Sequence, residues 1–576
     1  MITCEMDRLT PSARRLVKNR VAGRVRAKDA SLYAFSPEAE ACARRFMGWT
    51  DLATNPPMAP AEIRRIADEL VDEGFAYAVL IGQGGSTQAP MTITKYNKAD
   101  DSNRVGFKTI DSMSPVRVRE LMSTICPDKT LFILASKSGS TVEPRVMLAA
   151  LREELKHYMP EEEIPRHLAA ITDPGSPVDQ QAREEGWRVV LHGEPTVGGR
   201  FSALSVFGLF PAALVGVDLE AALGRARVAE ERCSEDRIDN PAVCLAAFLY
   251  DNYLAGRNKF SFLTPKRGRV LGLWIEQLVA ESLGKEGKGI LPNIEIDPLL
   301  LAKDPGDRCV IMYQTKNDLW DERKNFEMSL SYVDHTIPTL NFRIDDVDEL
   351  AEHFVMWEYA IAMCGWLMQV NPFDQPDVAD TKARVVKMLA EGVPAPDFVE
   401  PFAPIAHMGD VEVRSSRAVA ADKTPATLHD ALYSLFSTVE TGDYFALNVF
   451  LPFTGEYRRE ALEEIRHGVA RTFRVPSCLE VGPRYLHSTG QLQKGGPNQG
   501  VFLVLSADEL RDIPLQAEAP SLGELAKTQA IGDWAALSER GRRAVHVHLP
   551  DNTAAALRAL AEMVKEVLHE VRESRA

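Results

Sequence analysis

A short segment rich in hydroxyl groups, SKSGSTVEP at residues 136–144, stands between an expected strand and an expected helix. Ser138, Ser140 and Thr141 fall where the first turn of that helix has unpaired N–H groups, and such a helix end attracts anions through these groups and its dipole. An ordinary Ser/Thr helix cap is the alternative. Three hydroxyls with a glycine and a lysine in one turn exceed what a cap needs, so the segment predicts phosphate binding.

An earlier glycine-rich turn, GQGGSTQAP at residues 82–90, also follows an expected strand. Its glycines allow a ligand or another backbone segment to approach closely. The turn does not match the G-x-G-x-x-G dinucleotide pattern, because the third glycine is missing. A tight strand-to-helix turn explains these glycines equally well, so spacing alone makes Gly85 and Ser86 only candidate ligand contacts.

Two residues of opposite charge stand beside glycines. Arg200 follows two glycines in VGGRF (197–201) and precedes an apolar run, which favours a position near a buried crevice over the more usual solvated surface. Glu281 lies near the end of an expected helix in AESLGKEGKG (280–289), where a solvated helix-end carboxylate is the alternative. No G-x-x-x-x-G-K-[ST] nucleotide loop occurs in that segment. Both residues are candidates for a buried site.

Two further segments carry basic groups that can exchange protons. NPFDQPDVADTK (371–382) is a proline-punctuated turn that leads into a helix with Lys382 in its early turns. RYLHSTGQLQKGG (484–496) places His487 between aromatic and apolar residues on one side and a glycine-rich exit on the other. A single histidine is more often packed or exposed than catalytic, so the pattern favours His487 only modestly.

Strands and helices alternate along most of the chain at the spacing that is typical of parallel sheets covered on both faces. In the first half, the expected strands are short apolar runs at 77–82, 130–136, 167–172 and 187–193. In the second half, the expected strands are 259–265, 308–315, 338–344, 443–451, 500–507 and 543–550. The sequence therefore predicts an α/β fold with two units of similar construction.

Three segments fall outside this alternation. The first fifty residues mix basic and apolar positions and are expected to be helical and peripheral. Residues 218–257 are Ala-rich and are expected to form a helical connection, and residues 391–424 are Pro-rich and are expected to form an irregular surface excursion. The predicted domains are a helical N-terminal segment at 1–50, a first domain at 51–217, the connection at 218–257 and a second domain at 258–576.

The overall charge excludes some classes of partner. The chain has 576 residues, with 66 Lys and Arg against 82 Asp and Glu, and a formal net charge of −16. An acidic surface repels nucleic acid and anionic lipid, so neither is an expected partner, although a local basic pocket can still bind a small anion. The eight cysteines form no C-x-x-C pair and no Cys/His cluster, which argues against a disulfide framework and a zinc site.

Targeting and membrane signals are not evident in the sequence. The N-terminus, MITCEMDRLTPSARR, has no apolar core of the kind that a secretory signal needs. The longest stretch without charge, residues 201–217, is short of a membrane span and contains Gly208 and Pro211. We therefore expect a cytoplasmic protein with no membrane partner.

Six of these segments together resemble the phosphoglucose isomerase family, specifically the isomerase half of the enzymes in which transaldolase and phosphoglucose isomerase are fused. They are GGS (84–86), SKSGSTVEP, VGGRF, ESLGKEGKG, NPFDQPDV with the following Lys382, and LHSTGQ (486–491). The resemblance extends from about residue 50 to the C-terminus with no transaldolase barrel before it, so we expect a free-standing version. It implies two sugar-isomerase (SIS) domains, each a mainly parallel sheet flanked by helices, and a homodimer.

The resemblance also implies where a phosphosugar substrate binds. Its phosphate is expected to sit on four residues of the hydroxyl-rich segment: Ser136, Lys137, Ser138 and Thr141. Gly85 and Ser86 are expected to line the sugar. The implied reaction is the reversible isomerisation of glucose 6-phosphate to fructose 6-phosphate through ring opening and a cis-enediol intermediate. It needs no metal and no cofactor.

Four residues match the catalytic groups of the family. Glu281 matches the carboxylate that moves a proton between C1 and C2, and Arg200 matches the arginine that supports the developing negative charge. His487 and Lys382 match the groups that help open the sugar ring. Chain order departs from the family in one respect. Ordinary members carry the histidine motif before the lysine motif, whereas here His487 follows Lys382 by about a hundred residues.

Two other functions remain open from the sequence. Sugar-isomerase domains also occur in sensors that bind a phosphosugar and regulate transcription, but the presence of Glu281, Arg200 and Lys382 favours an enzyme. An isomerase that acts on both glucose and mannose phosphates would carry the same motifs, because the choice between these epimers depends on one hydroxyl contact near C2.

Overall fold

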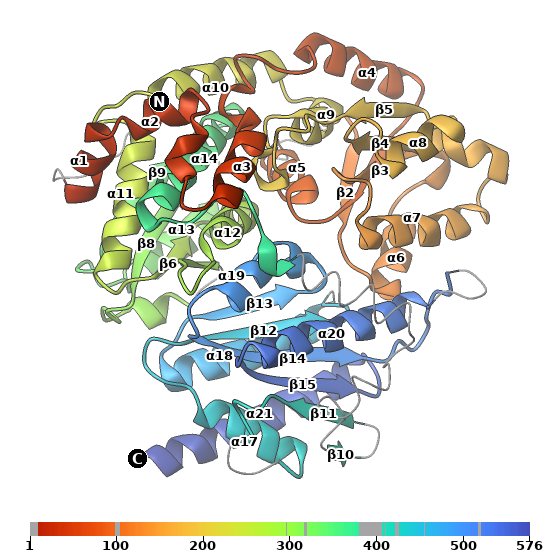
Figure 1. Ribbon diagram of the computed structural model, residues 1–576. Helices are drawn as coiled ribbons and strands as arrows, with labels where there is room; N and C mark the ends of the chain where they lie inside the picture. The colour runs from red at the N-terminus through yellow and green to blue at the C-terminus, as the bar shows by residue number, and fades with distance from the viewer. Residues whose placement is uncertain are drawn as a thin grey trace. The chain divides into compact units, whose positions relative to one another are not determined.

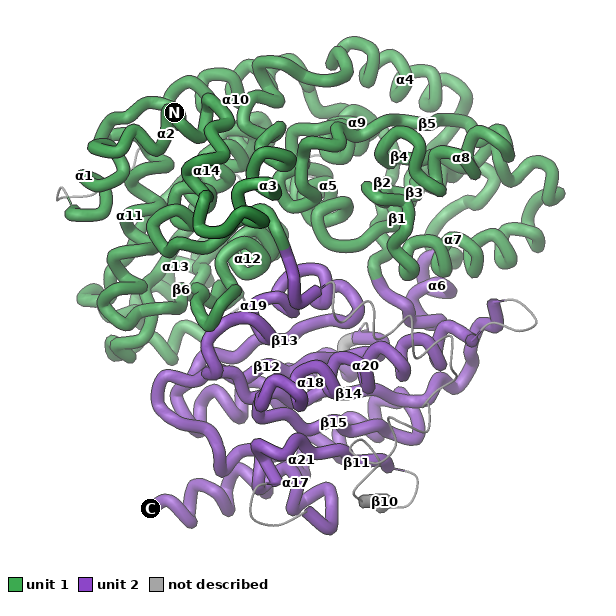
Figure 2. Tube along the Cα trace, viewed as in Figure 1, with its two compact units in different colours: residues 1–111, 122–374 green, residues 112–121, 375–576 purple. Residues whose placement is uncertain are grey.

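The structure, a computed structural model, is divided into two compact units. The described residues are 10–97, 104–294, 297–315, 320–378, 406–408, 411–420, 425–453, 455–515 and 520–576. Unit 1 comprises residues 1–111 and 122–374, and unit 2 comprises residues 112–121 and 375–576 (Figure 2). Each unit is described by itself.

A five-stranded parallel sheet forms one part of unit 1 (Figure 1). Its strand order is β2-β1-β3-β4-β5. The strands are β1 (Tyr77–Gly82), β2 (Gly106–Ile110), β3 (Thr130–Ala135), β4 (Leu168–Thr172) and β5 (Val189–His192). Its helices are α4 (Pro60–Asp72), α5 (Gly85–Tyr96), α7 (Val142–Leu155), α8 (Pro177–Glu184) and α9 (Val206–Leu214). All six residues of β3 are buried, as expected for a parallel strand covered on both faces.

A four-stranded parallel sheet forms the other part of unit 1, with the order β7-β6-β8-β9. The strands are β6 (Lys259–Leu263), β7 (Leu291–Ile294), β8 (Arg308–Gln314) and β9 (Thr339–Arg343). The helices are α12 (Arg269–Leu283), α13 (Trp320–Leu330) and α14 (Leu350–Met368). Both sheets of unit 1 place the first strand of the sheet between the second and the third, so their topologies correspond.

Unit 2 contains a third sheet, with the order β10-β11-β15-β14-β12-β13. The strands are β10 (Ala406–Met408), β11 (Val411–Ser415), β12 (Tyr444–Phe450), β13 (Ser477–Val481), β14 (Gly500–Ala507) and β15 (Arg543–Leu549). Strands β12 to β15 pair in parallel, while β10 and β11 pair antiparallel at one edge. The helices are α6 (Pro115–Met122), α17 (Leu428–Ser437), α18 (Glu456–Phe473), α19 (Gly490–Gly495), α20 (Leu522–Glu539) and α21 (Ala554–Arg575).

The α/β fold of mainly parallel sheets flanked by helices is confirmed. The segment 258–576, which we expected to be one domain, instead contains two separate sheets, and the boundary between the units falls after Asp374. Alternation of strands and helices indicates parallel pairing, but it does not state which strands share a sheet. The alternating pattern therefore predicted a single domain for a segment that contains two sheets.

The N-terminal helices are not peripheral. They are α1 (Pro11–Lys18), α2 (Val21–Arg26) and α3 (Pro37–Phe46), with 3-10 turns at Ala30–Tyr33 and Gly48–Asp51. Leu16, Val25 and Tyr33 are fully buried in the core of unit 1. The hydroxyl of Tyr33 donates to the carbonyl oxygen of Ala362 in α14, 3.0 Å away. The apolar positions among the basic residues of this segment are therefore core positions.

Of the other two segments with a sequence-based expectation, one is fully described and the other only in part. Residues 218–257 form α10 (Leu219–Cys233) and α11 (Pro241–Leu254), and both helices pack on α14. Most of the expected excursion at 391–424 lies outside the described residues, but residues 411–415 form the strand β11. None of the helices in the described ranges is both long enough and apolar enough to cross a membrane.

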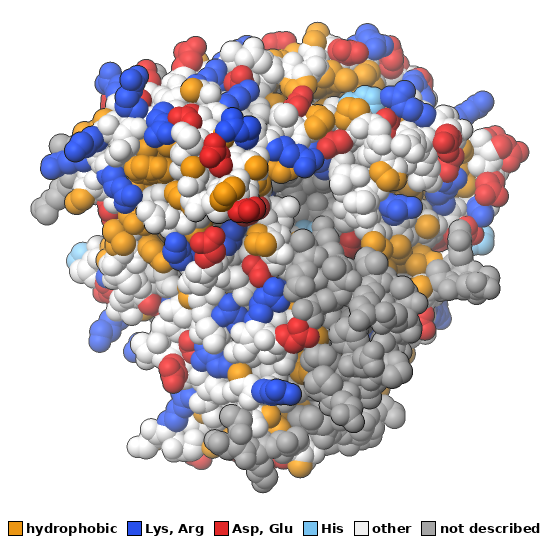
Figure 3. All heavy atoms as spheres, viewed as in Figure 1, with side chains coloured by type: hydrophobic (Ala, Val, Ile, Leu, Met, Phe, Trp, Pro, Cys, Tyr) orange, Lys and Arg blue, Asp and Glu red, His pale blue; other side chains and the backbone are white. Residues whose placement is uncertain are grey.

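Charge is mixed over the surface that Figure 3 shows. On that face, Lys and Arg side chains are interspersed with Asp and Glu side chains, most visibly in the upper half of the view. Short stretches of apolar surface lie between them. Over the coloured part of this face, the net negative charge is therefore not gathered into one acidic region.

Candidate active site

Glu281 and Arg200 meet in the interior of unit 1. Glu281 lies in the last turn of α12 and is 7% exposed. Its Oε1 is 3.4 Å from Nη1 of Arg200, which is 4% exposed. The Nε2 of Gln277 donates to the other carboxylate oxygen at 3.1 Å, because residues four apart share a helix face. The sequence interpretation missed Gln277, although its i−4 position relative to Glu281 was a usable signal.

Several hydrogen bonds hold the guanidinium of Arg200 in place. Its Nε donates to the hydroxyl of Ser282 at 2.7 Å. Its Nη2 donates to the carbonyl oxygens of Pro372 and Asp374 at 2.6 and 2.9 Å. With these anchors on two sides, the planar fork presents Nη1 toward Glu281 without freedom to rotate. The arginine is therefore a fixed donor beside the carboxylate.

Lys285, which the sequence interpretation did not select, is a second buried cation in this site. It is 3% exposed, and its Nζ donates to the carbonyl oxygens of Asn371 and Asp374 and to the Asp374 carboxylate, at 2.5 to 2.6 Å. Burial lowers the pKa of Lys285 to about 8, despite the opposing charge of Asp374. Lys285 and Arg200 thus share one acceptor, the carbonyl oxygen of Asp374. The sequence contained a signal for this residue, because the motif ESLGK places Lys285 four residues after Glu281.

Replacing Lys285 by methionine tests the lowered pKa of this buried lysine through the pH dependence of the free energy of unfolding. The folded protein loses the lysine proton near pH 8, whereas the unfolded chain keeps it to about 10.5, so stability rises with pH between these values. We expect the wild type to gain unfolding free energy relative to Lys285→Met from pH 8 to 10.5, measured by denaturant titration. A relative loss would show that the lysine stays protonated in the fold.

The glycine-rich turn after β1 supports the backbone that carries Arg200. Gly84 has a φ of +55°, a conformation that favours glycine. A Cβ atom on Gly85 would lie 2.1 Å from the carbonyl oxygen of Gly199 and 2.8 Å from the backbone nitrogen of Arg200. Gly85 is therefore a close-packing residue against the arginine turn. Ser86 follows it in the first turn of α5 and is buried.

The hydroxyl-rich segment leads from β3 into α7. Thr141 is the N-cap of α7, but its side chain does not cap the helix. The Oγ atoms of Ser138 and Ser140 are 2.8 Å apart, and the buried Oγ of Ser136 has no hydrogen-bond partner among the described residues. Gly139 has a φ of +65° between the two serines. This turn thus gathers hydroxyls and uncapped N–H groups at one helix end, the arrangement that binds anions.

Lys137 is already engaged by other groups. Its Nζ lies 2.6 Å from Oδ2 of Asp173 and donates to the carbonyl oxygen of Glu194 at 3.1 Å. A phosphate contact of this ammonium has to compete with that ion pair. The lysine contributes less net positive charge to the turn than the sequence alone suggested.

The two turns lie beside each other because their strands are neighbours. Strands β1 and β3 pair in parallel, with Gly82 opposite Ala135, so both chains leave the same edge of the sheet together. Gly85 then contacts the turn of Arg200, and α5 packs against α12, which carries Glu281. The pairing of β1 with β3 therefore brings the two turns to one edge of the sheet, and the glycine turn contacts the turn that carries Arg200.

His487 belongs to unit 2 and is 8% exposed. It ends the 3-10 turn Arg484–His487, and the loop around it is anchored on Asp533 of α20. The hydroxyl of Tyr485 donates to Oδ2 of Asp533, and Nζ of Lys494 lies 2.5 Å from Oδ1 of the same residue. These buried contacts fix both ends of the histidine motif.

The same motif contacts the start of the lysine motif within unit 2. The amide of Gln491 donates to Oδ2 of Asp377 at 2.6 Å, and the backbone N–H of Asp377 donates to Oε1 of Gln491 at 3.0 Å. Lys382 itself lies outside the described residues. Folding thus joins two motifs that lie 114 residues apart at this contact.

The described part of the chain contains no group of three or more His, Cys, Asp or Glu side chains that could hold a metal ion.

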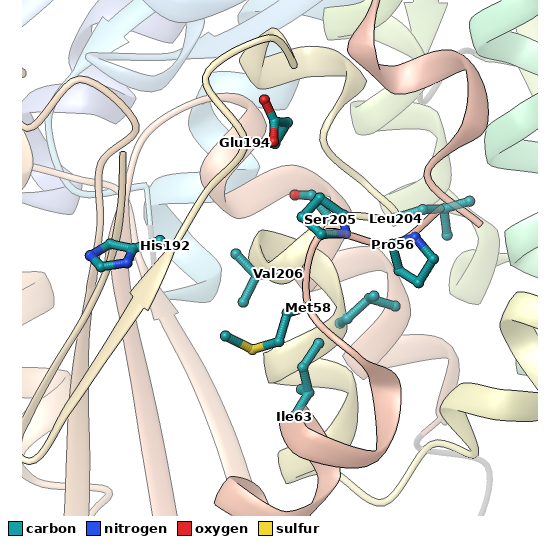
Figure 4. A pocket seen from close by; sticks show the side chains of 10 residues that line it. Pro56, Met58, Ile63, His192, Glu194, Leu204, Ser205 and Val206 are labelled. Atoms are coloured by element: carbon teal, nitrogen blue, oxygen red, sulfur yellow. The ribbon is translucent and has the colours of Figure 1, made fainter. Parts of the chain in front are cut away.

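Figure 4 shows a small hollow between the end of β5 and the starts of α4 and α9, with Met58, Ile63 and Val206 forming an apolar wall. Its free volume of about 10 Å³ is that of one water molecule, which is too small for a sugar.

Comparison with known proteins covers the part of the chain that forms the Arg200–Glu281 site. The family described as phosphoglucose isomerase matches residues 73–291. The glucose-6-phosphate isomerase of Carboxydothermus hydrogenoformans is 34% identical over 398 residues, which are 60% of this chain and 85% of that protein. The glucose-6-phosphate isomerase of Mycoplasmopsis pulmonis is 29% identical over 392 residues, 60% of this chain and 90% of that protein.

Solved structures with the same fold agree with these matches. A hypothetical protein from Thermus thermophilus has a TM-score of 0.56 and 25% identity, covering 68% of this chain and all of that one. A glucose-6-phosphate isomerase from Chlamydia trachomatis has a TM-score of 0.55 and 18% identity, covering 67% of this chain and 87% of that one. With a relative more than 30% identical over most of its length, the chain belongs to the glucose-6-phosphate isomerase (phosphoglucose isomerase) family.

Proposed function

We propose that this chain catalyses the reversible isomerisation of glucose 6-phosphate to fructose 6-phosphate through ring opening and a cis-enediol intermediate. The observation that carries the proposal is the buried pair of Glu281 and Arg200, 3.4 Å apart. A carboxylate can move a proton, and a fixed guanidinium can stabilise the negative charge that this movement creates.

The chemistry needs one base and one cationic donor. Glu281 takes the proton from C2, the electron pair of that C–H bond forms the C1–C2 double bond, and the C1 oxygen gains negative charge. A proton also passes from the C2 hydroxyl to the C1 oxygen. The same carboxyl group then returns a proton to C1, and the electron pair left on the C2 oxygen forms the carbonyl at C2. Arg200 stabilises the enediolate oxygen because its anchors hold Nη1 in place before the charge develops.

The phosphate of the substrate does not react, and it supplies positioning. In this proposal the hydroxyl-rich turn binds the phosphate through Ser136, Ser138 and Thr141, with Lys137 beside them, and Gly85 and Ser86 line the sugar. The uncapped start of α7 and the unpartnered Oγ of Ser136 support this placement.

Replacing Ser138 and Thr141 together by alanine tests the phosphate turn. We expect KM to rise at least tenfold with a smaller change in kcat, because the lost contacts bind the unreactive end of the substrate. Inorganic phosphate should inhibit the wild type competitively and the double variant more weakly. The double variant Ser437→Ala and Thr438→Ala, at the end of α17, is the matched control. Equal inhibition constants in the wild type and the Ser138/Thr141 variant would place the anion elsewhere.

His487 and Lys382 complete the proposal as the groups that open the sugar ring. Ring opening needs a proton delivered to the ring oxygen and a proton removed from a hydroxyl, and a histidine near neutrality can do either. The contact between Gln491 and Asp377 supports a joint role, because it holds the histidine motif against the start of the segment that leads to Lys382.

The ring-opening role predicts a dependence on substrate form. His487→Ala should slow turnover of the cyclic sugar phosphate at least tenfold more than turnover of an analogue that cannot cyclise, because only the cyclic form needs the ring-opening step. Steady-state kinetics on both substrates measure this difference. His429→Ala, at a half-buried histidine of α17 that pairs with Glu570, is the control. Equal losses on the two substrates would remove His487 from ring opening.

The experiment that tests the function is an isomerase assay of the purified chain with glucose 6-phosphate, with mannose 6-phosphate assayed in parallel to define epimer choice. Binding of phosphosugar without turnover would contradict the proposal and indicate a sensor.

The proposal includes a homodimer that acts in the cytoplasm, as the family resemblance implies. Light scattering on the purified protein measures the mass of the particle and thereby tests the dimer.

A further inference from the structure

A cavity of about 310 Å³ lies in the second sheet of unit 1, and none of the proposed catalytic residues lines it. It lies at the carboxyl end of β6, next to the start of α12 and one face of α13. Its polar lining includes Thr264, Lys266, Arg269 and Ser329, and its apolar lining includes Phe326 and Leu330. A volume of this size accommodates a small organic molecule.

The polar part of the lining is positively charged. Lys266 and Arg269 both have exposed side chains at the mouth of the cavity. Among the described residues, no acidic side chain forms an ion pair with Lys266. Among the described residues that line the cavity, none is acidic. An anion in the cavity would therefore meet the ammonium of Lys266 and the guanidinium of Arg269, which also interacts with another group.

The backbone at the cavity adds to this preference. Helix α12 has 15 residues and begins at Arg269, directly after a 3-10 turn at Lys266–Gly268. The backbone N–H of Arg269 donates to the carbonyl oxygen of Lys266, so the helix start acts on an anion mainly through its dipole. The hydroxyl of Thr264 is buried and has no hydrogen-bond partner in the described structure. A Cβ atom on Gly268 would lie 1.9 Å from that hydroxyl oxygen, so the unpartnered hydroxyl lies directly against the helix start. A buried hydroxyl and two cationic residues thus line the cavity beside the positive end of the helix dipole.

The position in the sheet is one at which open parallel sheets bind ligands. The first strand of the second sheet, β6, has β7 on one side and β8 on the other. The chain therefore reverses its winding direction beside β6, and crevices at the carboxyl ends of such strands are the usual ligand sites. The first sheet has the same arrangement around β1, whose carboxyl end carries the glycine turn.

We infer that this cavity binds a small phosphate monoester, with the phosphate at Lys266, Arg269 and the start of α12 and the organic part against Phe326 and Leu330. The cavity is separate from the substrate site, because Glu281 lies twelve residues further along α12, which is about 18 Å of helix. The inference does not depend on the proposed isomerase activity.

Calorimetric titration with phenyl phosphate tests the inference, because this probe joins a phosphate to a flat apolar body. We expect Lys266→Glu to remove one bound phenyl phosphate per chain, or to weaken that site at least tenfold, relative to the wild type. Ser329→Trp, which fills the cavity from α13, should have the same effect. Lys18→Glu, an equal charge change on the exposed face of α1, should leave binding unchanged.

Two results would overturn the inference. One is equal stoichiometry and affinity for phenyl phosphate in the wild type, Lys266→Glu and Ser329→Trp. The other is an equal loss in Lys18→Glu, which would show a general effect of charge. Binding to the Ser138/Thr141 double variant separates this site from the substrate site, since its cavity is intact and should retain the probe. Isomerase turnover in the same preparations reports on the proposed function independently.

Discussion

Glu281→Gln is expected to lower kcat by about 10²- to 10⁴-fold while substrate affinity stays close to that of the wild type. Glutamine keeps the size of the side chain and can still meet Gln277 and Arg200, but it cannot accept the proton from C2. The substitution therefore removes the chemical step and preserves the surroundings. Steady-state kinetics and equilibrium binding of a reduced, non-isomerisable sugar phosphate measure the two quantities separately.

A nearby carboxylate provides the control for this result. Glu286 lies five residues after Glu281 and is exposed. Glu286→Gln removes the same charge from the same segment and should leave kcat unchanged. A Glu281→Gln variant that keeps more than a tenth of the wild-type kcat would contradict the assignment of Glu281 as the base.

Arg200→Lys is expected to lower kcat by about 10²- to 10³-fold, in the range seen when a donor to a developing oxyanion is removed. Lysine keeps the positive charge, but one ammonium cannot reach the Ser282 hydroxyl, the Pro372 and Asp374 carbonyl oxygens and the substrate together. The lost property is the fixed direction of the donor, and charge alone does not replace it.

Stability measurements separate the loss of kcat in Arg200→Lys from a loss of folded protein. Arg188→Lys, at the surface ion pair with Glu73, is the matched control and should keep full activity. The melting temperature of Arg200→Lys shows whether the fold survives at the assay temperature. Addition of guanidinium to Arg200→Ala should restore part of the activity, because the small cation can occupy the vacated donor position. Full kcat in Arg200→Lys would show that the charge suffices and the anchors do not matter.

Local sequence patterns predicted the turns of the site well. Apolar runs that end in glycines or hydroxyls indicated β1 and β3 and the two turns after them, since a buried parallel strand and a helix start each leave a signature within a few residues. The position of Glu281 near the end of a helix followed from the same local reasoning, and the structure has it in α12. The family resemblance then supplied the residue roles that spacing alone left open.

Tertiary structure decided what surrounds these residues. The contact between Arg200 and Glu281 and the clamp of Lys285 on Asp374 join segments that lie 81 and 89 residues apart. Whether a charged residue is solvated or buried depends on such partners, and neither periodicity nor composition encodes them. This is why the solvated alternatives for Arg200 and Glu281 could be rejected only from the three-dimensional arrangement.

The division into sheets was decided in the same way. Strands β8 and β9 join β6, whereas β12 to β15 belong to a different sheet together with β10 and β11, although β8, β9 and β12 to β15 all follow the same alternating pattern. The basic residues of the N-terminal segment suggested a surface helix, but its apolar side chains fill the core around α14. By itself the sequence determined the class of fold and the chemistry of the turns, because these depend on neighbours within a few residues. The pairing of strands and the burial of charges depend on contacts across the whole chain, and only folding determines them.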